Sequence, residues 1–242
     1  GSPCSLPTKF TAIEMIPDRN RIFRFVRQCL PDFEPSGSPE ELSGGNLNVV
    51  WSISGTGGSV IAKHAPPYIA ANPDVPMSAG RLTFEANALK SFMPSDLLSD
   101  LDQEYVQPPK LLGFDEENSL LLMEDIYPSM PWFEALSSGS AEIEMAADLG
   151  RFIGELHRIS YGKSVFAGQF DNQPVQETRY RVQYLSLADS LSQRKDTISH
   201  LAAEKCRNLG RLLLEPGRCL VMGDLWPPSL LWSRKKIRII DS

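Results

Sequence analysis

The sequence predicts an α+β fold in two lobes, the first rich in β-strands and the second helical. Apolar runs separated by turn residues fill the first half, whereas after Pro131 the apolar residues recur at helical spacing. We therefore expect an N-terminal lobe over residues 1–123, a hinge or connector over 124–131 and a helical C-terminal lobe over 132–242. A cleft between the lobes is the natural place for a ligand.

The first predicted element is a helix that begins after Asp18. The Asp18 side chain is a suitable cap because it can accept hydrogen bonds from the first backbone N–H groups of a helix. Apolar residues then recur at helical spacing as far as Leu30, and Pro31 ends the helix. Proline, serine, glycine and glutamate make residues 34–45 a loop.

Two β-hairpins flank the second predicted helix. In residues 46–64, alternating apolar side chains are followed by the turn GTGG and a second apolar strand. Residues 65–80, rich in proline, alanine and asparagine, form a long loop that leads to a helix over 81–93. Two apolar runs around an acidic turn predict the second hairpin at 110–125.

The second lobe is predicted to be helical almost to its end. An apolar stripe predicts a helix that covers residues 146–160, and two further helical stretches cover 177–193 and 196–214. The closing segment, from Val221, has the pattern strand, turn, short strand, turn, strand.

The composition excludes several classes of function. A net charge of −6 argues against a nucleic-acid-binding face. The longest apolar runs are far too short to span a bilayer, so no membrane association is expected. None of the four cysteines forms a CxxC pair, which argues against a zinc site. Cys29 and Cys219 lie in apolar runs, and we interpret them as buried thiols of a protein from a reducing, cytoplasmic compartment.

Lys63 is the first candidate for chemistry. It ends an apolar strand, and the segment SGGNLN at 43–48 leads into the neighbouring strand. Glycine lets the backbone approach a phosphate closely, and a lysine on the adjacent strand can reach the same phosphate. Glu85 on the next helix could hold Lys63 through a charge-assisted hydrogen bond. Each residue alone has an ordinary explanation, a strand edge for the lysine and a solvated helix surface for the glutamate.

Two aspartates near the C-terminus complete the pattern. DLWPPS contains Asp224 and Ser229, and IRIIDS contains Asp241 after an apolar run. Phosphoryl transfer requires a carboxylate that orients the attacking hydroxyl and accepts its proton. It also requires a hard oxygen ligand for Mg²⁺. A lone aspartate is more often a turn residue or cap, but two at this spacing, downstream of Lys63 and Glu85, follow the order found in kinases.

These features resemble the aminoglycoside phosphotransferase / choline kinase-like superfamily, with a closer likeness to the methylthioribose kinases. The likeness runs from about Leu42 to Asp241 and includes GGNLNVVWSISG, SVIAKHAPPYI, RLTFEANAL and LLLMEDI. It implies a protein-kinase-like two-lobed fold with a nucleotide-binding N-lobe and with ATP and Mg²⁺ as cofactors. The implied reaction transfers the γ-phosphate of ATP to a small-molecule hydroxyl, on a methylthioribose-like sugar, an aminoglycoside or another alcohol.

The resemblance also implies a role for each matching residue. Asp224 would be the catalytic base, and Ser229 and Asp241 would face Mg²⁺. Lys63 would contact the ATP phosphates and Glu85 would anchor it, while the backbone of a hinge at 123–126 would contact the adenine edge. The implied cofactor-binding residues are Gly44, Gly45, Asn46, Asn48, Lys63, Glu85, Met123, Glu124 and Ile126, with Asp125 also in the hinge.

Three departures from the superfamily pattern keep other hypotheses open. Met222 stands where the superfamily has a histidine, and Ser229 is a weaker metal ligand than the usual asparagine. Family members also continue beyond the second aspartate with helices that complete the C-lobe and build much of the acceptor site. The resemblance therefore implies an incomplete C-lobe, in a chain that is either a piece of a longer protein or a naturally shortened relative.

The alternative to an active kinase is a truncated nucleotide-binding or interaction module without turnover. A third hypothesis, that nucleotide binding is also lost, is weakened by the presence of Lys63, Glu85, Asp224 and Asp241. An incomplete C-lobe would leave apolar surface exposed, and a homodimer that covers it would fit either of the first two hypotheses.

Overall fold

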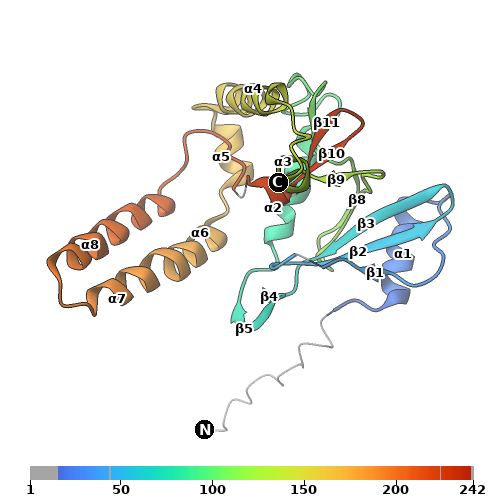
Figure 1. Cartoon of the computed structure of the whole chain (residues 1–242). Helices are drawn as coiled ribbons and strands as arrows, with labels where there is room; N and C mark the ends of the chain where they lie inside the picture. The colour runs from blue at the N-terminus through green and yellow to red at the C-terminus, as the bar shows by residue number, and fades with distance from the viewer. Residues whose placement is uncertain (1–15, 44, 224, 241–242) are drawn as a thin grey trace, which may run out of the picture.

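A five-stranded antiparallel sheet forms the centre of the first lobe (Figure 1). The structure is a computed structural model, which describes residues 16–43, 45–223 and 225–240. The strand order is β1-β2-β3-β8-β7. The five strands are β1 (Glu40–Glu41), β2 (Val49–Gly55), β3 (Gly58–His64), β7 (Leu111–Asp115) and β8 (Leu120–Glu124).

Two helices cover the two faces of this sheet. Helix α1 (Arg19–Cys29) begins as expected, with the Asp18 carboxylate accepting a hydrogen bond from the Arg21 backbone N–H at 2.8 Å. Its apolar side packs against alternate residues of β2, β3 and β8. Helix α2 (Arg81–Ser91) packs against the opposite face, which the other residues of β3 and β8 form. Because both faces are covered, consecutive residues are apolar in the middle of β3 (Val60 to Ala62) and along most of β8 (Leu120 to Met123).

A second, four-stranded sheet joins segments that are far apart in the sequence. Its order is β6-β11-β10-β9, and β6 pairs with β11 in parallel. The strands are β6 (Val106–Gln107), β9 (Met130–Pro131), β10 (Leu230–Ser233) and β11 (Lys236–Ile239). Helix α4 (Ile143–Ser160) contributes Phe152 and Leu156 to the core beside this sheet, and residues from 92 to 106 join the same core.

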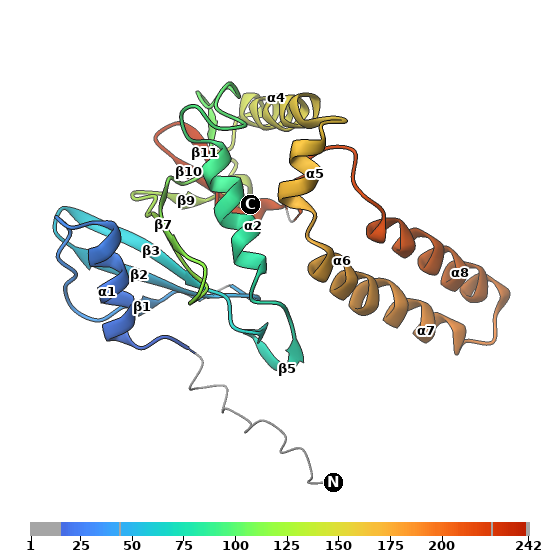
Figure 2. The same cartoon turned by 180° about the vertical axis from the view of Figure 1, so that it is seen from behind.

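The remaining helices form an arm that projects from the body of the molecule (Figures 1 and 2). The two long sides of this arm pack closely at Gly210, which has no side chain. A Cβ at that position would lie 2.6 Å from the Cβ of Tyr184. Apolar side chains on its surface are exposed, and Ile198 is 79% exposed. The arm consists of α6 (Gln173–Arg179), the π-helical η2 (Tyr180–Leu185), α7 (Ser186–Ser192), α8 (Thr197–Arg211) and η3 (Leu212–Leu214). Two short helices precede it, α3 (Trp132–Ser137) and α5 (Ser164–Phe170).

The expected helices and both hairpins are confirmed, with some differences in the loops. The predicted loop at 65–80 contains a small hairpin of β4 (Tyr68–Ile69) and β5 (Asn72–Pro76). The first strand expected in the closing segment is absent from residues 219–223. Cys29 and Cys219 are half-buried, so the prediction of buried thiols is wrong.

Two predictions about the whole chain have different outcomes. Among the described helices, none combines the length and apolar character that crossing a membrane requires. The lobe boundaries at 123 and 131 remain predictions.

Candidate active site

Lys63 and Glu85 form a buried ion pair between strand β3 and helix α2. The Lys63 Nζ atom donates a hydrogen bond to Glu85 Oε1 at 2.7 Å, and Lys63 is only 4% exposed. The same Nζ atom donates to the backbone oxygen of Ile240 at 2.9 Å. The contact between the two side chains that the sequence predicts is therefore present, and their roles toward ATP remain predictions.

Ile240 connects Lys63 to the catalytic loop predicted around Asp224. Its backbone N–H donates to the backbone oxygen of Ser229 at 3.0 Å, while its own oxygen accepts from Lys63. Ile240, which precedes Asp241 in the sequence, thus lies beside both the lysine of the first lobe and the loop that follows Asp224. Asp224 and Asp241 themselves lie outside the described residues, as does Gly44.

Ser229 is buried in a short helical turn, η4 (Pro227–Ser229). Its hydroxyl donates to the Trp226 backbone oxygen at 2.8 Å and accepts from the Trp226 backbone N–H at 3.2 Å. Within the part of the chain that the structure describes, no group of three or more histidine, cysteine, aspartate or glutamate side chains could hold a metal ion. The metal-binding roles of Ser229 and Asp241 remain predictions.

The loop before β2 holds the remaining predicted phosphate-binding residues. Gly45 and Asn46 are exposed, and Asn48 is half-buried. A Cβ on Gly45 would lie 3.2 Å from the backbone oxygen of Asn48. Glycine therefore lets the backbone at position 45 lie close to the backbone of Asn48. The backbone oxygen of Asn46 accepts from Ala71 at 3.0 Å, which ties this loop to the β4–β5 hairpin.

Arg81, at the start of α2, was not among the candidates from the sequence. It is 7% exposed, and its guanidinium donates five hydrogen bonds to oxygen atoms of the loops around it. Burial lowers the pKa of Arg81 to about 10, although the negative charge of Glu85 acts in the opposite direction. One signal could have found it: Arg81 and Glu85 are four residues apart and thus share a helix face.

Two acidic side chains of the predicted hinge accept hydrogen bonds from neighbouring segments. The Glu124 carboxylate accepts from Arg238 Nη2 at 2.7 Å and from the Lys110 backbone N–H at 3.1 Å. The Asp125 carboxylate accepts a hydrogen bond from the Ser59 hydroxyl. Met123 and Ile126 are buried. The predicted contacts of this segment with adenine remain predictions.

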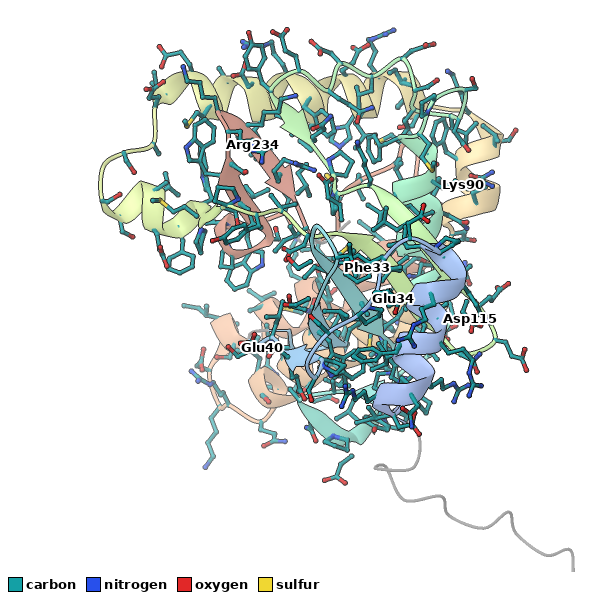
Figure 3. All side chains as sticks on the ribbon, turned by 90° about the vertical axis from the view of Figure 1, so that its right-hand side faces the viewer. Phe33, Glu34, Glu40, Lys90, Asp115 and Arg234 are labelled. Atoms are coloured by element: carbon teal, nitrogen blue, oxygen red, sulfur yellow. The ribbon has the colours of Figure 1, made fainter. Side chains whose placement is uncertain are left out.

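Two cavities lie away from these residues. One, of about 630 Å³, lies between α1 and the β7–β8 turn, where Asp115 is located beside the helix (Figure 3). The other, of about 370 Å³, is lined by β5 and by residues of α6, η2 and α7. None of the predicted site residues that the structure describes lines either cavity, so neither cavity supports the site inferred from the sequence.

A comparison with known protein families decides the classification. The sequence model described as "APH: Phosphotransferase enzyme family" matches residues 38–241. The chain belongs to this phosphotransferase family. The match includes both the Lys63–Glu85 pair and the C-terminal segment that contains Ser229 and Ile240, so it covers every part of the site described above.

Individual members of the phosphotransferase family show how much of their length the chain spans. It is 31% identical over 134 residues to a methylthioribose kinase of Escherichia coli, covering 52% of this chain and 30% of that protein. It is 25% identical over 218 residues to a 4-hydroxytryptamine kinase of Psilocybe cubensis, covering 83% of this chain and 58% of that protein. The chain thus spans less than two thirds of either relative.

A solved phosphotransferase supports the same fold. The structure of a spectinomycin phosphotransferase in complex with ADP and spectinomycin covers 93% of this chain and 70% of its own, with a TM-score of 0.51 and 11% identity. At this identity the likeness concerns the fold alone.

The Glu124–Arg238 ion pair should couple the hinge to β11 energetically. In a double-mutant cycle with Glu124→Gln and Arg238→Met, we expect a coupling free energy of about 1–2 kcal/mol, because both side chains are at least two-thirds buried. Chemical denaturation of the four proteins measures it. The exposed Glu155–Arg158 pair on α4 is the control, with an expected coupling below about 0.5 kcal/mol. Equal coupling in the two cycles would contradict this prediction.

Proposed function

We propose that this chain carries the nucleotide-binding and catalytic segments of an ATP-dependent small-molecule kinase. The observation that supports this most is the double contact of Lys63 Nζ, with Glu85 at 2.7 Å and with the Ile240 oxygen at 2.9 Å. It brings a buried cation of the first lobe next to the position that precedes Asp241. A cation held beside a predicted metal-binding carboxylate suits a polyphosphate whose oxygens both would contact.

In the proposed reaction, Asp224 accepts the proton of the acceptor hydroxyl. The hydroxyl oxygen forms a bond to the γ-phosphorus, and the bond between that phosphorus and the β–γ bridging oxygen breaks, which releases ADP. Lys63 holds the phosphate oxygens in place, and Glu85 holds Lys63. Asp241 and Ser229 would hold Mg²⁺, which neutralises charge on the phosphate oxygens. The backbone at 123–126 would contact adenine.

A hydroxyl on a methylthioribose-like sugar is the first acceptor to test, because a methylthioribose kinase is among the relatives. The relatives also include a kinase named for 4-hydroxytryptamine, so a hydroxyl on an aromatic ring is the second acceptor to test. Aminoglycosides and other alcohols follow from the family name and the resemblance alone.

A nucleotide-binding module without turnover is the second candidate function. It is favoured by Ser229, whose hydroxyl is engaged with the backbone of Trp226 at 2.8 and 3.2 Å. A hydroxyl that already forms hydrogen bonds within its own helical turn is less available to coordinate a metal ion. Under this candidate the chain binds ATP but produces no ADP with any acceptor.

Calorimetric titration with ATP, with and without Mg²⁺, is the test of the proposal. We expect binding to this chain to require Mg²⁺, and we expect Asp241→Ala to abolish this requirement together with most of the affinity. Asp100→Ala, at an exposed position, is the matched control and should behave as the parent chain does. If neither the chain nor the control binds ATP, both candidate functions are wrong. Binding without ADP formation would favour the second.

A further inference from the structure

Arg81 connects three segments that are separate in the sequence, one of which includes the start of β4. Its Nη2 atom donates to the backbone oxygens of Leu47 at 2.6 Å and Tyr68 at 3.3 Å. Nε donates to Asn48 Oδ1 at 2.9 Å. Nη1 donates to the backbone oxygens of Pro66 and Ser78, both at 2.8 Å. A guanidinium has five N–H groups, so these five bonds use its full capacity.

The charge of Arg81 is an additional feature of this site. All five acceptors are neutral oxygen atoms, and burying a cation among neutral groups costs free energy. The pKa of Arg81, lowered to about 10 by burial, still leaves the group protonated at neutral pH. Glu85, one helical turn away, acts on Arg81 and also pairs with Lys63. Among the described residues, Arg81 and Lys63 thus both interact with the carboxylate of Glu85, and Arg81 adds a positive charge beside that ion pair.

The place of this charge matters for the proposed kinase. Arg81 and Glu85 lie on the same face of α2, so this helix carries both the anchor of Lys63 and the clamp on the loop at 46–48. That loop and Lys63 are the two groups expected to contact the phosphates of ATP. A side chain that fixes the loop relative to Lys63 would pre-form the phosphate site and add positive potential to it.

We propose that Arg81 is a positioning residue, which holds the loop at 46–48 in the conformation that receives the ATP phosphates. This inference rests on the proposed function. Arg81 acts through the loop and through Glu85, and needs no contact of its own with the nucleotide.

The variants Arg81→Lys and Arg81→Met separate the effect of the hydrogen bonds of Arg81 from the effect of its charge. Lysine keeps the charge but has too few donors for five bonds, and methionine keeps neither. We expect Arg81→Lys to raise KM for ATP about tenfold, the effect of losing one or two net hydrogen bonds, with KM for the acceptor unchanged within about twofold. Arg81→Met should raise KM for ATP further, because the positive potential is also lost. Arg158→Lys, at an exposed position of α4, should change neither constant.

Hydrogen exchange of the nucleotide-free protein tests the positioning itself. In Arg81→Lys, backbone amides at 46–50 and 68–71 should exchange faster, while those of α1 and α4 keep their rates. Unchanged exchange at 46–50 would overturn the inference, even for a chain that binds no ATP. A uniform rise of exchange across the molecule would also overturn it, since Arg81 would then serve stability only. An unchanged KM for ATP in the folded Arg81→Lys variant would do the same.

Asn48→Ala is the second variant, for the case that the Arg81 variants do not fold. It removes the acceptor of the Nε bond and leaves the guanidinium in place. We expect the backbone amides at 46–50 to exchange faster. KM for ATP should rise about two- to threefold, which is the low end of what one net hydrogen bond contributes. If Asn48→Ala matches the parent chain in both measurements, the inference is wrong. Failure of the parent chain to bind ATP would instead count against the proposed function.

Discussion

Replacing Lys63 by methionine should lower kcat/KM for ATP-dependent phosphoryl transfer by about 10²–10³-fold. The methionine side chain is unbranched and can take the buried place of the lysine stem between β3 and α2. It removes the only charge that Lys63 would bring to the phosphates, in a buried site where that charge is poorly screened by water. Steady-state kinetics with ATP and an acceptor found by screening measures the effect. Activity within twofold of the parent would contradict the assignment.

Glu85→Gln is the companion variant to Lys63→Met. The glutamine amide can still accept a hydrogen bond from Lys63 but carries no charge, so we expect a smaller loss, about tenfold in kcat/KM. In Lys63→Met alone, the buried Glu85 carboxylate loses its hydrogen-bonded ammonium group, which should lower stability. The double variant Lys63→Met with Glu85→Gln should regain stability but not activity. That pattern separates the catalytic role of Lys63 from its structural one.

The sequence predicted the elements that carry strong local signals. The cap by Asp18, the apolar strands of both hairpins and the helix with Glu85 are examples, because a capping side chain or a regular apolar pattern marks each. Strands β6 and β9 carry no such signal. Each has two residues, too few to show periodicity, and each is fixed by pairing with the distant strands β11 or β10.

The site was predicted in the same uneven way. Lys63 and Glu85 could be selected because ionisable side chains at the end of a strand and on the next helix suggest a pair. Arg81 could not be selected as readily, because four of its five partners are backbone oxygens. Every residue has a backbone oxygen, so the sequence does not reveal which of them a buried arginine will meet.

Leu121 and Leu122 provide the second large prediction, which concerns the fold and the site together. Both side chains are fully buried on β8 and point to opposite faces of the sheet. Each substitution by alanine should lower the free energy of unfolding by about 3 kcal/mol, through lost apolar burial and a residual cavity. Urea denaturation measures both losses, and a loss below about 1 kcal/mol in either would contradict the assigned packing. Leu136→Ala is the control and should cost little, because Leu136 is an exposed residue of α3.

The two variants should differ in their effect on ATP. Leu121 lies opposite Lys63 in the β3–β8 register and packs against the side of the sheet that α2 covers. Leu121→Ala should therefore loosen the helix that carries Glu85 and Arg81, and raise KM for ATP several-fold. Leu122 packs toward α1, so Leu122→Ala should lose the same stability with KM for ATP unchanged. Equal changes in KM would mean that α2 does not set the geometry of the phosphate site.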